Sequence, residues 1–70
     1  MAEIRADMVA NVMEIYFAEG DTVNPGDTVV LLESMKMEIP VIADQGGKVV
    51  RLGVSVGDVV QEGDLIIETE

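Results

Sequence analysis

The sequence predicts an all-β domain folded as a flattened barrel or sandwich. Its apolar runs are short and rich in β-branched residues, and Gly, Asp, Asn and Pro separate them. The clearest runs lie at 29–32, 39–43, 48–52 and 65–67. Strands of this length at regular spacing, with turn residues between them, are typical of all-β sandwiches and barrels. One turn motif also occurs twice, which indicates a fold made of two similar halves.

A shift of 37 residues aligns these halves. Residues 20–27 read GDTVNPGD and residues 57–64 read GDVVQEGD, which are identical at five of eight positions. In both copies Gly supplies positive φ and Asp accepts hydrogen bonds from its own turn, so we interpret the motif as a turn and not as a calcium or phosphate loop. Neither repeat, at 4–33 or 41–70, is large enough to bury an apolar face alone. We therefore expect one domain over 1–70, with its halves packed about a pseudo-twofold axis.

Composition excludes several classes of function. Fourteen acidic residues against four basic ones give a net charge of −10, which repels nucleic acid and anionic lipid. Charged residues interrupt the first apolar stretch at Glu3, Arg5 and Asp7, so we expect no signal peptide and no membrane span, and a cytoplasmic location. The absence of His and Cys leaves no parts for a hydrolase triad or a structural zinc site. We therefore expect neither a catalytic residue nor a metal.

The segment between the halves is the most informative. Residues 33–38 read ESMKME and join two predicted strands without Gly, Asn, Asp or Pro. If Met35 and Lys36 are the central turn residues, the strands pair in register as Leu32 with Ile39, Val30 with Val41, and Glu33 with Glu38. A shift by one residue would set Leu32 against Glu38 and mix core with solvent. The pattern therefore predicts a two-residue turn at Met35–Lys36.

Met–Lys is a poor sequence for such a turn. Two-residue hairpins favour Asn-Gly or Asp-Gly, because a type I′ turn needs positive φ at both central positions. Glu33 opposite Glu38 adds a like-charge pair. Local violations of this kind tend to lie at functional sites. A plainer interpretation stays open from these residues, in which Lys36 is a solvated turn lysine that screens two carboxylates.

The run Glu33-Ser34-Met35-Lys36-Met37 resembles the Glu-Ala-Met-Lys-Met motif of biotinyl-attachment domains. It lies between two Gly-Asp-x-Val-x-x-Gly-Asp segments, as in that family, and the resemblance covers essentially the whole chain. Small free-standing biotin/lipoyl attachment proteins are the most similar members. The resemblance implies two four-stranded antiparallel sheets, with the modified lysine exposed on the hairpin between the halves. That lysine corresponds to Lys36, and Ser34 replaces the usual Ala with another small residue.

The resemblance also implies a function. Biotin protein ligase would attach biotin covalently to Lys36, and the domain would carry a carboxyl group between a biotin carboxylase and a carboxyltransferase. The chain would be a carrier and not an enzyme. A lysine amine is almost entirely protonated at pH 7, so its activation must come from outside. Met35 and Met37 would be recognised by the ligase, and we also expect Met37, on the inward register, to pack partly against the core.

Two alternatives remain beside the biotin carrier. Lipoyl domains share the fold and the lysine, although there the lysine usually follows Asp, so the flanking methionines favour biotin. The second alternative is an unmodified acidic β-module that binds a protein partner.

Overall fold

The computed structural model describes residues 2–70, which form eight strands. These are β1 (Ala2–Arg5), β2 (Ala10–Ile15), β3 (Thr22–Val23), β4 (Thr28–Ser34), β5 (Met37–Ile42), β6 (Gly47–Leu52), β7 (Val59–Val60) and β8 (Leu65–Thr69). The four apolar runs predicted as strands fall in β4, β5, β6 and β8, with only Ala43 lying one residue beyond the end of β5. The predicted all-β class is confirmed.

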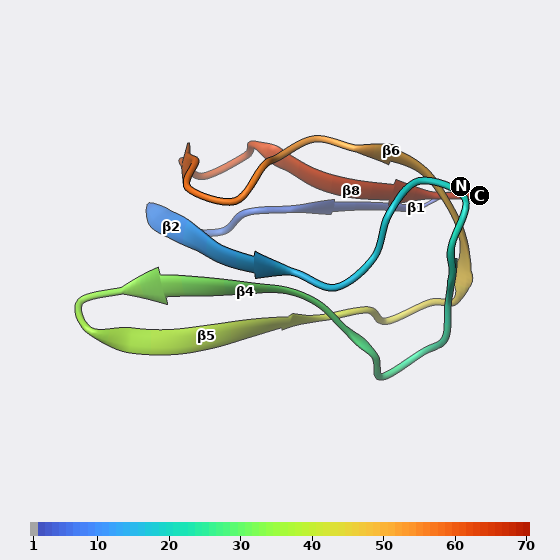
Figure 1. Cartoon of the computed structure of the whole chain (residues 1–70), viewed down its shortest axis with the longest axis horizontal. Helices are drawn as coiled ribbons and strands as arrows, with labels where there is room; N and C mark the ends of the chain where they lie inside the picture. The colour runs from blue at the N-terminus through green and yellow to red at the C-terminus, as the bar shows by residue number, and fades with distance from the viewer. Residues whose placement is uncertain (1) are drawn as a thin grey trace.

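The strands form two four-stranded antiparallel sheets that face each other (Figure 1). One sheet has the order β1-β8-β6-β3 and the other β5-β4-β2-β7. A shift of 37 residues relates β1 to β5, β2 to β6, β3 to β7 and β4 to β8. When each strand is replaced by its related strand, the order of the first sheet becomes the order of the second. The predicted pseudo-twofold relationship is therefore a property of the whole topology.

The Gly-Asp motifs are turns, and their aspartates hold them. Asp27 Oδ2 accepts a hydrogen bond from the backbone N–H of Asn24 at 2.9 Å, and Asp64 Oδ2 accepts one from Gln61 at 2.9 Å. Asp21 and Asp58 do the same for the N–H groups three residues before them, at 2.9 and 2.8 Å. The four glycines that precede these aspartates have φ between 91° and 96°, which L side chains rarely adopt. These carboxylates therefore serve turn geometry.

Each half accepts backbone hydrogen bonds from a turn of the other half. The N–H of Gly26 donates to the carbonyl of Ala43, and the N–H of Gly63 donates to the carbonyl of Ala6, both at 2.8 Å. Residues 26 and 63, and residues 6 and 43, are related by the same shift of 37. Because the partners belong to opposite halves, neither half can complete its own turns. The two repeats therefore depend on each other for these hydrogen bonds.

The core lies between the sheets and is almost wholly aliphatic. Its buried apolar residues are Ala6, Ala10, Val12, Val23, Val29, Val30, Leu32, Ala43, Val49, Val54, Val60, Ile66 and Ile67. Of the two aromatic side chains, Phe17 packs against this core and Tyr16 stays 48% exposed. In the described part of the chain, no helix is long and apolar enough to cross a membrane.

The β4–β5 hairpin and the chain ends occupy opposite ends of the molecule. Ala2 pairs with Thr69, so β1 begins beside the end of β8. Figure 1 shows the C-terminus at one end of the long axis and the β4–β5 hairpin protruding at the other. The shift of 37 predicts this arrangement, because it maps residues 36 and 37 onto the two positions before the first residue. The hairpin tip is thus clear of whatever the chain ends contact.

Candidate functional site

The tip of the β4–β5 hairpin has the predicted register. Glu33 lies opposite Glu38, Leu32 opposite Ile39, and Val30 opposite Val41. Ser34 pairs with Met37 and closes a turn whose two central residues are Met35 and Lys36. Burial alternates along β5, and this register places its half-buried Ile39 and Val41 opposite the buried Leu32 and Val30 of β4.

Met35 and Lys36 both adopt left-handed backbone conformations. Their φ values are 55° and 65°, and they are the only non-glycine residues of positive φ in the part of the chain that the structure describes. Such a conformation costs an L residue with a Cβ on the order of 1–2 kcal/mol. The sharp reversal holds the Lys36 side chain at the outermost point of the hairpin. The turn therefore lowers the stability of the hairpin while it exposes the Lys36 side chain.

The side chains of the turn are solvated. Lys36 is exposed, Met35 is 87% exposed and Met37 is 60% exposed. The expectation that Met37 packs partly against the core is wrong, although its position on the inward register is right. The hairpin protrudes beyond the opposite sheet (Figure 1), so no layer covers the inner face at Met37. Ser34 is half-buried beside the turn.

The electrostatics of the tip do not suit a catalytic lysine. Glu33 and Glu38 flank the turn, and no carboxylate of residues 2–70 comes within 4.0 Å of the Lys36 amine. Lys36 is therefore solvated and makes no ion pair with a described carboxylate. A nucleophilic or basic lysine is instead found desolvated or beside another cation. Across the described residues, no three His, Cys, Asp or Glu side chains could together hold a metal ion.

The other lysine lies in a different setting. Lys48 is on β6 and pairs with Thr22 of β3, as the prediction of a strand at 48–52 requires. Its side chain is exposed but belongs to a regular strand. Only Lys36 combines a reversed backbone, a protruding hairpin and flanking exposed methionines.

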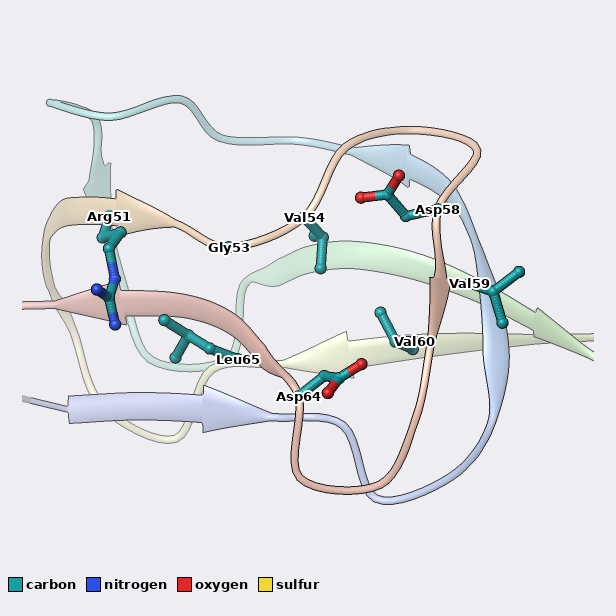
Figure 2. A pocket seen from close by; sticks show the side chains of 8 residues that line it. All are labelled: Arg51, Gly53, Val54, Asp58, Val59, Val60, Asp64 and Leu65. Carbon is teal, nitrogen blue, oxygen red and sulfur yellow. The ribbon is translucent and has the colours of Figure 1, made fainter.

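A hollow of about 410 Å³ lies elsewhere, under the segment that links β6 to β8 (Figure 2). Its apolar lining includes Val54, Val60 and Leu65, with Arg51 on one side and Asp58 on the other. The polar groups are already used, because Arg51 lies 3.6 Å from Glu68 and Asp58 holds its own turn. The sequence contains a signal for this hollow, since the shift of 37 aligns Gly53 and Val54 with the bulkier Tyr16 and Phe17.

Comparison with known proteins agrees with this geometry. The sequence profile of the family described as "Biotin-requiring enzyme" (Biotin_lipoyl) matches residues 2–69. The chain belongs to the biotin/lipoyl attachment family. It is 60% identical to the biotinylated protein TB7.3 homolog of Mycobacterium leprae, over 94% of both chains. It is also 40% identical to the biotin/lipoyl attachment protein of Bacillus subtilis, over 93% of this chain and 89% of that one.

A solved structure supports the fold of this biotin/lipoyl attachment domain. A single-chain, multi-domain long-chain acyl-CoA carboxylase contains a region that superposes on 94% of this chain with a TM-score of 0.86 and 33% identity. That region is 7% of the carboxylase chain. Biotin/lipoyl attachment domains are carriers and not catalysts.

Proposed function

We propose that this chain is a biotin carrier, modified on Lys36 by biotin protein ligase. The observation that carries the proposal is the position of Lys36 at the apex of a protruding hairpin, with positive φ and no ion pair to a described carboxylate. An enzyme that must enclose a lysine amine needs this side chain clear of the barrel. The name of the Mycobacterium leprae relative supports biotin as the attached group.

The residues of the tip have distinct tasks in this proposal. Lys36 supplies the amine. Its nitrogen would bond to the acyl carbon of biotinyl-adenylate, which the ligase makes from biotin and ATP, while AMP leaves and the amine gives up its proton. Met35, at 87% exposure, offers the ligase an apolar surface beside that amine, and Met37 offers a second one. Glu33 and Ser34 complete the motif at the end of β4. The barrel holds these groups rigidly and contributes no chemistry.

The attached biotin would carry a carboxyl group from a biotin carboxylase to a carboxyltransferase. The hairpin contributes reach, because a tethered group has a high effective concentration at every site that its arm can enter. The similarity to a domain within an acyl-CoA carboxylase supports partners of this class. The surface charge of −10 suits docking on basic enzyme surfaces.

Intact mass after incubation with a biotin protein ligase, biotin and ATP tests the assignment. Wild type should gain the mass of one biotinyl group, Lys36→Arg should gain none, and Lys48→Arg should label as wild type does. Arg preserves the charge, so the variants differ only in which amine is present. Labelling that persists in Lys36→Arg would overturn the proposal.

A lipoyl carrier is the second candidate, because the Bacillus subtilis relative is named for both groups. The flanking residues separate the candidates. Met35→Asp should weaken biotinylation and favour a lipoate ligase, and its effect on the free energy of unfolding should stay below about 1 kcal/mol, since Asp tolerates positive φ better than Met. Labelling by both ligases and thermal melting should be measured together. If Met35→Asp is biotinylated at the wild-type rate, Met35 has no part in recognition.

A further inference from the structure

Two grooves between the sheets are related by the pseudo-twofold axis. One is about 140 Å³ and is lined by Ala2, Glu3, Ile4, Asp44, Gln45 and Thr69. A shift of 37 turns these positions into Ile39, Pro40, Val41, Asp7, Met8 and Leu32, and all six line a second groove of about 320 Å³. The first, the terminal groove, lies toward the chain ends. The second, the hairpin groove, lies along β5, which begins at the turn that holds Lys36.

The two grooves share an architecture but differ in chemistry. Gln45 in the terminal groove corresponds to Met8 in the hairpin groove, and Thr69 corresponds to Leu32. Ala2 corresponds to the larger Ile39, and the charged Glu3 corresponds to Pro40. Since the two halves have the same strand order, the fold does not require an apolar groove at this position. The groove at the lysine end of the molecule is the larger and the more apolar of the two, with Arg5 and Asp7 as the charged residues of its lining.

An apolar path leads from the turn to this groove. Met37, Ile39 and Val41 lie on one face of β5, because side chains alternate along a strand. Met37 is 60% exposed, whereas Ile39 and Val41 are half-buried against the core. Buried Leu32 and Ile66 form the floor of the groove. Ile39 is three residues from Lys36, which is about 10 Å along a strand.

From this path we infer that the acylated side chain of Lys36 folds back along β5 and places its ring in the hairpin groove. The inference rests on the proposed biotinylation. An extended chain spans about 3.4 Å for every three bonds, so an arm of about ten bonds reaches roughly 11 Å, enough to arrive at Ile39. A free Lys36 amine would stay in water, because burying a charge is costly. Amide formation removes the charge and makes the arm apolar enough to enter.

Chemical acylation tests this inference without any ligase. Lys48→Arg leaves Lys36 as the only lysine, and its amine attacks an N-hydroxysuccinimide ester of biotin or of acetic acid. The Lys36 nitrogen bonds to the acyl carbon, N-hydroxysuccinimide leaves, and the amine proton passes to the buffer. The adduct modified only at Lys36 is purified and checked by peptide mapping. The acetyl adduct loses the same charge but is too short to reach the groove.

The readout is the methyl NMR spectrum of the labelled protein. Biotinylation should shift the methyl resonances of Met8 and Ile39 and give nuclear Overhauser effects to the biotin ring, whereas acetylation should do neither. The Ala2 methyl, in the terminal groove, is the internal control. Met8→Gln, which copies Gln45, should at least halve the Ile39 shift, and Gln45→Met should leave it unchanged.

The biotinyl and acetyl adducts of Lys48→Arg, in which both grooves are unchanged, decide the question even if a groove variant unfolds. Biotinyl and acetyl adducts with the same spectra at Met8 and Ile39, or changes confined to residues 33–38, would overturn the folded-back arm. A full Ile39 shift in folded Met8→Gln would overturn it too. Failure of the proposed function is detected separately, as a lack of enzymatic labelling in the intact-mass experiment.

Discussion

Glu33 and Glu38 lie directly opposite each other across the β4–β5 hairpin. Directly opposed like charges oppose strand pairing. Neither carboxylate forms an ion pair within 4.0 Å inside residues 2–70. The turn that these residues flank adds two non-glycine residues of positive φ, Met35 and Lys36. The hairpin tip therefore carries two features that reduce its own stability, and both lie at the proposed attachment site.

Replacing Glu38 with Gln should stabilise the protein. We expect the free energy of unfolding to rise by about 0.2–1 kcal/mol at low salt, because the like-charge pair is removed. The gain should shrink at high salt, where screening weakens the repulsion. Urea unfolding at two salt concentrations measures both effects. Glu62→Gln is the control, since it removes the same charge from an exposed turn, and an equal gain there would mean that only net charge matters.

Replacing Asp64 with Ala should destabilise the turn before β8. The carboxylate accepts the hydrogen bond from Gln61 N–H, so its loss should lower the free energy of unfolding by about 0.5–1.5 kcal/mol. Asp27→Ala, at the pseudo-symmetric turn, should cost a similar amount. Asn keeps an acceptor oxygen, so Asp64→Asn should retain most of the stability. If Asn is as damaging as Ala in denaturant unfolding, the hydrogen bond is not the cause.

Replacing Gly53 with Ala should be costly despite the exposure of that residue. A Cβ at this position would overlap the carbonyl oxygen of Leu65, so the backbone must shift. Such overpacking costs about 1–3 kcal/mol. In a domain of this size each kcal/mol lowers Tm by roughly 4–8 °C. Ser55→Ala, in the same exposed segment, is the control and should leave Tm nearly unchanged. If Gly53→Ala has the Tm of wild type, residue 53 does not lie tightly against the Leu65 carbonyl.

Tyr16 should ionise at a pH above its ordinary pKa of 10.0. The hydrogen bond from its Oη to Glu14 Oε2, 2.6 Å long, raises the pKa most, followed by partial desolvation and the charges of Glu14 and Glu38. Tyrosinate absorbance reports this residue alone, because the chain has one Tyr and no Trp. Glu14→Gln should lower the pKa more than Glu38→Gln. The reverse order would contradict the assigned hydrogen bond.

The raised pKa of Tyr16 has a consequence for stability. The folded state holds the phenol proton more tightly than the unfolded state does. The corresponding stabilisation is fully present below the unfolded pKa and is lost as pH rises through the folded pKa. Alkaline unfolding should therefore be less steep in Glu14→Gln.

The sequence by itself determined four of the eight strands, the Gly-Asp turns and the register of the hairpin. Only one register of 29–32 against 39–43 pairs Leu32 with Ile39 and keeps Glu38 off the core, and the structure has it. The repeated Gly-Asp turns depend on residues a few positions apart, such as Asp27 and Asn24. Local pattern is sufficient for features of this kind, because turn chemistry and side-chain alternation act within one segment.

The tertiary structure alone decided what each face meets. Met37 occupies the inward register yet is 60% exposed, because the hairpin extends past the opposite sheet. The hollow beside Gly53 and the unequal grooves at Met8 and Gln45 arise where segments distant in sequence approach each other. Alternation states which side of a strand is apolar, but burial depends on how far the facing layer reaches. That distance is set by the packing of the two halves and by no single segment.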